Sequence, residues 1–190
     1  MVAFALRSDG WYLRSDIIWS KPNSMPQSVK DRPTVDYDHI FLLTKNQKYY
    51  YDYEAVKEPA SPKHYNRYKS EFFVGSKESQ GANRPNKKSN TGGKLNVLET
   101  RNLRSVWTIS TANYKGAHTA VFPTKLVETC IRAGSPTGGV VLDPFCGSGT
   151  TGEVAVSLGR KFVGIELNED YCEMSSERIK KALLQMPLEI

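Results

Sequence analysis

The segment Val140–Glu166 constrains the fold of this chain more than any other stretch, because strand, turn, helix and strand follow one another within it. An apolar run ends at Asp143, a turn containing Gly147 and Gly149 follows, and a second apolar run ends at Glu166. Glycine lets a backbone turn tightly and approach a ligand where any Cβ would collide. A carboxylate that closes the next strand can accept two hydrogen bonds from a ribose diol. The pattern therefore predicts a nucleoside-cofactor site.

Two kinds of cofactor compete for this pattern. The run Gly147–Gly152 matches the dinucleotide sequence G-x-G-x-x-G, and Glu166 follows Gly147 by 19 residues, close to the ~20 expected of an NAD site. A P-loop is excluded, because no lysine follows the glycines. Only 24 residues follow Glu166, too few for the rest of a doubly wound dinucleotide domain. Asp143 and Phe145 suit an ammonium group and an apolar contact better than a pyrophosphate. An NAD-dependent oxidoreductase is therefore the alternative interpretation.

Three motifs in a fixed order resemble one enzyme family. Asp143–Thr151 reads DPFCGSGTT, Phe122–Leu126 before it reads FPTKL, and Val163–Glu166 after it reads VGIE. Together they are similar to the S-adenosylmethionine (SAM) site of bacterial and phage DNA amino-methyltransferases of the permuted β group, whose cofactor motifs come last. The resemblance implies an α/β, Rossmann-like fold with a mostly parallel sheet and an irregular target-recognition insertion. It also implies methyl transfer from SAM to adenine N6 or cytosine N4 of double-stranded DNA.

The resemblance assigns cofactor contacts residue by residue. Asp143 would face the methionine part of SAM, Phe145 would border the cofactor, Glu166 would hold the ribose hydroxyls, and Leu167 would lie against the adenine. The whole set expected to bind the cofactor is Phe122, Thr124, Lys125, Asp143, Phe145, Gly147, Gly149, Thr150, Glu166 and Leu167. Cys146 is not expected to be a nucleophile of the kind found in cytosine-C5 methyltransferases. Those enzymes need a Pro-Cys pair, and here Phe145 precedes Cys146. No metal is expected, because the leaving group departs as a neutral thioether.

The family activates its target amine with a tetrapeptide, (Asp/Asn/Ser)-Pro-Pro-(Tyr/Phe/Trp), which this chain does not contain. The tetrapeptide accepts the amino hydrogens, and its aromatic ring stacks on the flipped base. In the permuted order it precedes the strand that includes Ile17 and Ile18. We therefore expect the C-terminal part of a methyltransferase, inactive alone, with no catalytic residue of its own. Its sheet should lack the central strands between the one ending at Asp143 and the one at Tyr37–Thr44.

The resemblance also suggests where the target base and partners bind. Four residues match the family segment beside the target-base pocket: Trp19, Lys21, Pro22 and Asn23. Trp19 could stack on a flipped base, but a packed core tryptophan is an equally good interpretation. The partners considered are an N-terminal complementing chain and a cognate restriction endonuclease. A non-catalytic remnant or subunit that binds DNA is the second alternative function.

Positive charge is concentrated in residues 57–104. This segment has eleven basic and four acidic residues, a net charge of +7, whereas the whole chain of 190 residues carries +6. Such a patch attracts a phosphate backbone, although a solvated loop with chance charge explains it too. The segment is expected to be mobile without DNA. The candidates for DNA contact are Arg67, Arg84, Lys87, Lys88, Arg101 and Arg104.

Composition excludes several other classes of protein. No run of ~18 apolar residues occurs, so the sequence predicts no membrane span. The three cysteines are odd in number and lack CxxC spacing, which argues for reduced thiols in a cytoplasm and against disulfides or zinc. Together with the resemblance, this points to the cytoplasm of a bacterium, or of the bacterial host of a phage.

Local patterns predict the elements and three parts of the chain. The parts are a piece of the catalytic subdomain (1–56), the basic insertion (57–104) and the SAM-binding subdomain (105–190). Helices are expected at 1–10, 122–134 and 150–158 and from 169 onward, with strands at 11–20, 37–44 (buried), 105–109, 140–144 and 161–166. Asn168 should cap the last helix.

Overall fold

The computed structural model describes residues 2–60, 100–112 and 122–185. The chain divides into two compact units, one of Met1–Val56 with Arg104–Ile190 and the other of Lys57–Leu103. In the second unit, strand β3 (Glu58–Pro59) pairs antiparallel with β4 (Thr100–Arg101). The expected mobility of the basic insertion falls mostly on residues 61–99, which lie outside the described residues.

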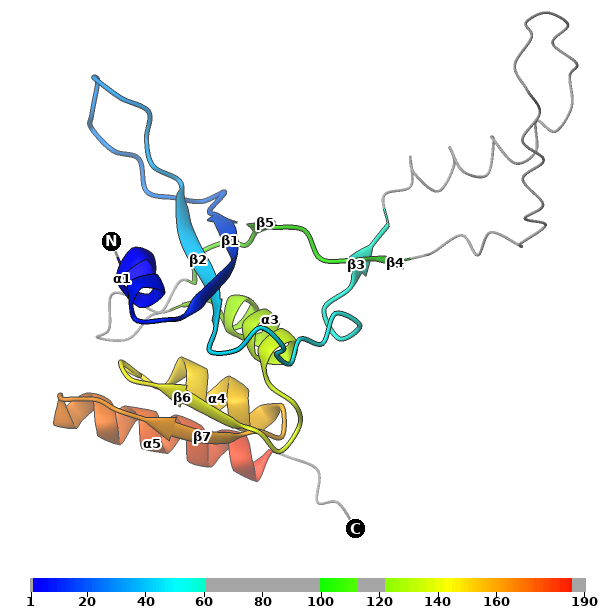
Figure 1. Cartoon of the computed structure of the whole chain (residues 1–190). Helices are drawn as coiled ribbons and strands as arrows, with labels where there is room; N and C mark the ends of the chain where they lie inside the picture. The colour runs from blue at the N-terminus through cyan, green and yellow to red at the C-terminus, as the bar shows by residue number, and fades with distance from the viewer. Residues whose placement is uncertain (1, 61–99, 113–121, 186–190) are drawn as a thin grey trace, which may run out of the picture. The chain divides into compact units, whose positions relative to one another are not determined.

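The first part of the larger unit is a helix followed by a three-stranded sheet (Figure 1). Helix α1 (Val2–Ser8) ends before Gly10, whose φ of 92° turns the chain into β1 (Tyr12–Ser20). Strand β2 (Tyr37–Thr44) pairs antiparallel with β1. Strand β5 (Val106–Thr108) pairs parallel with the other edge of β1, so the order is β2-β1-β5. These element positions confirm the sequence prediction.

The expected burial of β2 is wrong. Thr44 alone is buried among its eight residues, and Tyr37 and Phe41 are exposed. The reason is its place in the sheet: β2 lies at one end of the order, so only one of its edges has a partner among the described strands. A strand at a sheet edge leaves a row of N–H and C=O groups available for pairing.

The second part is a β-α-β unit with two further helices. Helix α3 (Thr124–Gly134) leads into β6 (Val140–Asp143), and helix α4 (Thr150–Ser157) connects β6 to β7 (Lys161–Gly164). The two strands are parallel, with Val140 opposite Lys161 and Asp143 opposite Gly164. Helix α5 (Glu169–Leu184) follows, and the Asn168 side chain accepts a hydrogen bond from the Tyr171 N–H, so the predicted cap is confirmed.

The core of this part lies on one face of the β6–β7 pair. Buried side chains of α3 and α4 meet there, and a Cβ on Gly152 would lie within 3 Å of the side chains of Phe162 and Ile179. The buried cluster and the half-buried residues packed on it are Val127, Ile131, Val154, Ala155, Val141, Leu158 and Phe162. In contrast, the residues Val140 and Leu142 are 62% and 60% exposed. The β6–β7 pair is therefore packed on one side and open on the other.

The described strands form three separate sheets, one mixed, one antiparallel and one parallel, instead of one mostly parallel sheet. The hydrogen-bonded orders are β2-β1-β5, β3-β4 and β6-β7. Within the larger unit, β1 and β2 pair antiparallel, whereas β1–β5 and β6–β7 are parallel pairs. None of the described helices is both long and apolar enough to cross a membrane.

Candidate functional site

The site begins where β6 ends. The Asp143 carboxylate accepts a hydrogen bond from the Phe145 N–H at 3.0 Å, which bends the chain out of the strand. The Cys146 N–H donates to the Ile165 carbonyl at 3.0 Å, so the turn stays attached to the chain leaving β7. Gly147 and Gly149 have φ values of 50° and 81°, in the left-handed region that favours glycine. Gly149 is also the N-cap of α4 and supplies no side chain to cap it.

This geometry leaves the first turn of α4 suited to a ligand. The first N–H groups of a helix have no intrahelical acceptor and carry the positive end of its dipole. With glycine at the N-cap, these groups are not covered by a capping side chain of that residue. The predicted contact through Thr150 concerns this backbone only, because the Thr150 side chain is buried and its hydroxyl accepts a hydrogen bond from Arg178.

The Glu166 carboxylate ties the turn to the end of β7. Its Oε2 accepts from the Gly147 N–H at 2.9 Å, and its Oε1 accepts from the N–H groups of Leu167 and Asn168, each at 3.0 Å. A carboxylate has about four acceptor positions, and these three bonds fix its orientation beside the turn. The expected carboxylate therefore stands directly beside the glycine turn.

Helix α5 supports the turn from behind through Ser175 and Arg178. A Cβ built on Gly149 would lie 2.4 Å from the Ser175 Oγ and 2.8 Å from its Cα, so the two backbones are in close contact. Arg178 Nη1 donates to the Ser148 carbonyl at 2.9 Å and to the Thr150 hydroxyl at 3.2 Å. Sequence reasoning missed both residues. The available signal was a serine and an arginine three positions apart in the predicted last helix.

The thiol of Cys146 has the character of a packing group. Partial burial raises its pKa, and the nearby negative charges of Asp143 and Glu166 add to the increase. Its Sγ lies 4.0 Å from the Ser175 Oγ, and that hydrogen bond opposes the increase without cancelling it. The thiol is therefore protonated at neutral pH, and a thiol is a much weaker nucleophile than a thiolate. This agrees with the prediction that Cys146 is no nucleophile.

Apolar side chains flank the turn and remain open. Phe145 is 88% exposed and Leu167 is 97% exposed, although both are large hydrophobic residues. Phe145 follows the end of β6, and Leu167 follows the end of β7. Exposed large apolar side chains of this kind are typical of surfaces that a ligand or a partner covers.

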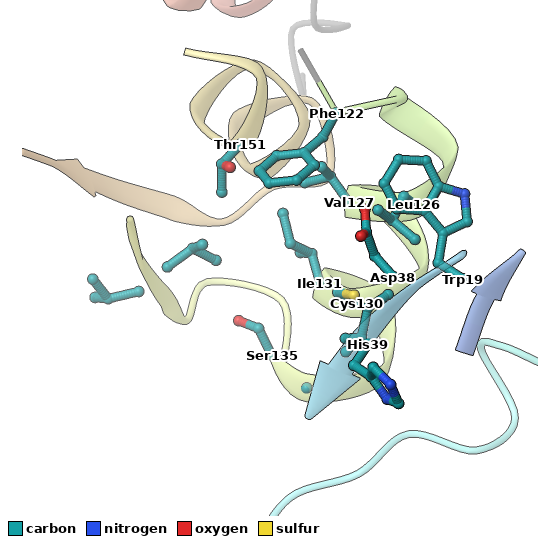
Figure 2. Close-up of a pocket in the computed structure, with 14 residues that line it drawn as sticks. Trp19, Asp38, His39, Phe122, Leu126, Val127, Cys130, Ile131, Ser135 and Thr151 are labelled. Carbon is teal, nitrogen blue, oxygen red and sulfur yellow. The ribbon is translucent and has the colours of Figure 1, made fainter. Parts of the chain in front are cut away.

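A cavity of about 680 Å³ lies between the β1–β2 hairpin and the α3–β6 region (Figure 2). Asp38 and His39 come from β2, Trp19 from β1, and Phe122 and Thr151 from the chain around α3 and α4. The remaining lining residues are Ile40, Leu126, Val127, Cys130, Ile131, Gly134, Ser135, Val140 and Val141. Most of this wall is apolar, and it includes residues from both β2 and β6.

The apolar residues at α3 that line this cavity differ in exposure. Leu126, Val127 and Ile131 are buried, whereas Phe122 and Cys130 are exposed on the cavity side. Although water reaches Cys130, the surrounding protein desolvates its thiolate and raises the pKa of Cys130 to about 11. The cavity is thus open to solvent but provides a poor environment for charge.

The cofactor candidates at the start of α3 do not all reach the glycine turn. Thr124 and Lys125 are exposed, and the Lys125 Nζ lies 3.5 Å from the Glu128 Oε2 in an ion pair along the helix. The structure therefore brings together Asp143, Phe145, Gly147, Gly149, Thr150, Glu166 and Leu167. Phe122 instead lines the cavity with Thr151.

The target-base candidates form a separate group near β1. Trp19 is 5% exposed and its indole Nε1 donates to the Ile109 carbonyl at 2.7 Å, contacts that fit a core tryptophan. Lys21 forms an ion pair with Asp38, and its Nζ lies 4.8 Å from the centroid of the Trp19 ring. The Asn23 side chain accepts from the Thr111 N–H at 2.8 Å. Pro22, between them, is exposed.

The DNA-contact candidates are only partly described. Arg67, Arg84, Lys87 and Lys88 lie outside the described residues. Arg101 Nε donates to the Glu58 Oε1 at 2.9 Å, across the β3–β4 pair. The Arg104 carbonyl accepts from the Trp107 indole at 2.6 Å.

Comparison with known proteins places this geometry in a family. Residues 1–177 match the model of the DNA methylase family N6_N4_Mtase. Type II methyltransferase M.SmaI from Serratia marcescens is 48% identical over 179 residues, which are 94% of this chain and 50% of that protein. M.Cfr9I from Citrobacter freundii is 45% identical over 179 residues, 94% of this chain and 48% of that protein. The chain thus spans about half the length of these relatives.

Solved structures agree on the fold. The cytosine-N4-specific PvuII DNA methyltransferase superposes with a TM-score of 0.62 at 19% identity, covering 100% of this chain and 56% of that one. The M1.HpyAVI–SAM complex gives a TM-score of 0.58 at 22% identity, covering 94% of this chain and 67% of that one. These identities show the fold alone, which is the expected Rossmann-like α/β fold. Because the sequence match extends over most of the chain, the protein belongs to the family of SAM-dependent DNA amino-methyltransferases.

Proposed function

We propose that this chain is the SAM-binding part of an enzyme that methylates the exocyclic amino group of adenine (N6) or cytosine (N4) in double-stranded DNA. The observation that carries the proposal is the Glu166 carboxylate bonded to the Gly147 N–H at the open N-terminus of α4. M.SmaI and M.Cfr9I, of which this chain covers about half, are both Type II methyltransferases. Their sequence similarity favours SAM over NAD for the same glycine pattern.

The residues at the turn fit the parts of SAM. Glu166 can accept the ribose hydroxyls, while Phe145 and Leu167 offer exposed apolar surface to the adenine and to the border of the cofactor. Asp143, whose Oδ1 already holds the turn, provides a negative charge for the ammonium of the methionine part. Gly147 and Gly149 allow close backbone approach. Phe122, Thr124 and Lys125 complete the proposed set on the side of α3.

When bound, SAM would supply an electrophilic methyl group, and its sulfonium sulfur would become a neutral thioether as the amine displaces it. The residues of this chain bind and orient the cofactor. The exocyclic amine of the target base must be activated by other residues. Its nitrogen is a poor nucleophile, because its lone pair is delocalised into the ring, and hydrogen-bond acceptors must draw its protons away. We assign this role to the proline-containing tetrapeptide of the family, which this sequence lacks.

A complementing polypeptide would supply that tetrapeptide and the strands between β6 and β2. Two observations support this part of the proposal. The edges of β2 and β6 have no strand partner on one side among the described residues. Residues of both strands, Asp38, His39, Ile40, Val140 and Val141, line the same cavity of about 680 Å³. Strands that pair with both edges would fill this space and join the two sheets.

DNA binding is proposed for the basic insertion. Its net charge of +7 suits a phosphate backbone, with Arg67, Arg84, Lys87, Lys88, Arg101 and Arg104 as candidates. A non-catalytic DNA-binding subunit shares this feature, so DNA binding alone does not separate the two functions.

Methyl transfer with and without the complementing part tests the proposal. The whole chain, duplex DNA and radiolabelled SAM are mixed, alone and after co-expression with the part of M.SmaI that this chain does not match. We expect no labelled DNA with the chain alone and labelled DNA with the pair. The control is a pair whose chain carries Glu166→Ala. Label transfer by the pure chain would contradict the split, whereas DNA binding without transfer by the pair would favour the non-catalytic subunit.

A further inference from the structure

Arg178 lies in α5 and is not among the residues predicted to contact the cofactor. Its guanidinium lies behind the glycine turn and donates from Nη1 to the Ser148 carbonyl, the Ser148 Oγ and the Thr150 Oγ1, at 2.9, 3.1 and 3.2 Å. Its Nη2 forms an ion pair with Glu153 in the first turn of α4. The Arg178 side chain is 19% exposed, so these contacts are largely screened from water.

These bonds fix a peptide group that would otherwise rotate. A trans peptide is planar, so its C=O and N–H point in opposite directions. For the peptide between Ser148 and Gly149, Arg178 holds the C=O and the Cys146 carbonyl accepts from the N–H at 2.9 Å. Gly149 has a φ of 81° and the wide conformational freedom of glycine. Both ends of the peptide before it are therefore anchored, and the first N–H groups of α4 keep one direction.

The chemistry of arginine suits this task. Its planar fork has five N–H donors and can bridge several acceptors at once, whereas the lysine ammonium is a compact point charge. A cation near the N-terminus of a helix is unfavourable by itself, because the helix dipole is positive there. Glu153 neutralises that charge locally. Arg178 can thus hold the turn without opposing the electrostatics of the site.

We propose that Arg178 is a positioning residue for the cofactor: it orients the backbone of Ser148–Thr150 so that the N-terminus of α4 receives SAM. The inference rests on the proposed cofactor site at the same turn. Arg178 acts through the backbone, so removing it weakens SAM binding more than its effect on stability explains.

Arg160 provides a matched control in the same unit. It is also an arginine that donates to backbone carbonyls, with its Nη2 at 2.7 Å from the Ser135 oxygen and its Nη1 bonded to the Leu158 carbonyl. These contacts lie at the opposite end of α4, away from the glycine turn. Arg160→Met therefore removes a comparable set of hydrogen bonds without touching the proposed site.

The experiment measures SAM affinity by calorimetry and Tm by thermal unfolding, using the whole chain with no substitution, Arg178→Met, Arg178→Lys or Arg160→Met. Losing a hydrogen-bonded charge that positions a ligand site corresponds to about a tenfold or larger increase in Kd. We expect that increase for Arg178→Met, an intermediate value for Arg178→Lys, and a Kd within twofold of the unsubstituted chain for Arg160→Met. Both methionine variants should lower Tm.

Three results would overturn the inference. The first is an unchanged Kd in Arg178→Met, and the second is an equal loss of affinity in Arg160→Met, because binding would then follow stability. If Arg178→Met does not fold, Arg178→Lys decides, and a Kd within twofold of the unsubstituted chain is the third. A different failure, no SAM binding by the unsubstituted chain, would refute the cofactor site itself.

Discussion

At the scale of single residues, the Glu166 carboxylate holds the glycine turn and, in our proposal, also binds the ribose of the cofactor. Three backbone N–H groups, those of Gly147, Leu167 and Asn168, hold it in place before any ligand arrives. A carboxylate fixed in this way loses little side-chain entropy when it accepts ribose hydroxyls, because its rotamer is already chosen. Its value to the site is therefore orientation as much as charge.

Glu166→Gln should weaken SAM binding by at least about tenfold, because hydrogen bonds to charged groups are worth about 1.5–3 kcal/mol. The amide keeps one acceptor oxygen and replaces the other with a donor, which would face backbone N–H groups. Calorimetry with SAM checks this, with Glu169→Gln as the control, since Glu169 is an exposed acid in the first turn of α5. Equal affinity of Glu166→Gln and the unsubstituted chain would exclude Glu166 from ribose binding.

The pH dependence of stability should report on the cavity through Cys130. Desolvation raises the pKa of its thiol from 9.0 to about 11 in the folded chain. Above pH 9 the unfolded chain loses this proton first, so the contribution to stability is complete below pH 9 and is lost as the pH rises toward 11. The free energy of unfolding, measured with denaturant, should fall less between pH 8 and pH 10.5 for Cys130→Ala than for the unsubstituted chain. Identical losses would contradict the desolvation of the Cys130 thiolate.

At the scale of elements, the glycine turn lies between the end of β6 and helix α5. The side chain of Asp143 shapes the exit from β6, and α5 packs so closely that Gly149 has no room for a Cβ next to Ser175. Two requirements therefore coincide at Gly149: a left-handed backbone and contact with a neighbouring helix. Either one alone would favour glycine, and together they allow nothing else.

Gly138 allows the two requirements at Gly149 to be separated. Gly138 has a similar φ of 76°, but a Cβ built there meets nothing within 4 Å. An alanine in the left-handed region costs roughly 1–2 kcal/mol. Gly138→Ala should lower the free energy of unfolding by that amount and keep SAM affinity. Gly149→Ala should cost clearly more and weaken SAM binding. Equal costs in denaturant titrations would show that the contact with Ser175 relaxes freely.

The elements themselves could be predicted from the sequence where local signals were strong. Asn168 before two acidic residues marks the start of α5, and Gly159 with a φ of 73° follows the end of α4. The burial of β2 could not be predicted, because it depends on whether a neighbour covers the strand. The contacts of Arg178 could not be predicted either, because they join it to Ser148 and Glu153, which lie 30 and 25 positions earlier in the chain.

At the scale of the whole molecule, the larger unit combines a packed core with exposed apolar surface. Of the β6–β7 pair, one face carries the core and the other exposes Val140 and Leu142. Adjacent open strand edges and apolar surface are a template for pairing with another chain. The same surface that would accept a complementing polypeptide should therefore attract copies of this chain when that polypeptide is absent.

Self-association should accordingly depend on the edge of β6. Sedimentation of the isolated chain should show association that rises with concentration, and Val140→Lys should weaken it, because a lysine on an edge strand opposes pairing. Leu184→Lys is the control, since Leu184 is 86% exposed, belongs to no strand and lies at the end of α5. Equal weakening by both variants would point to general hydrophobic contact instead of strand pairing.

Calorimetric titration of the whole folded chain with SAM, and separately with NADH, tests the central claim most directly. The claim is that a nucleoside cofactor with a sulfonium binds at the turn of Gly147 and Gly149, held by Glu166. The account predicts one binding event per chain with SAM, its loss in Glu166→Ala, and no heat with NADH. Folded protein that gives no heat with SAM at millimolar concentrations, or that binds NADH tightly in its place, would contradict it.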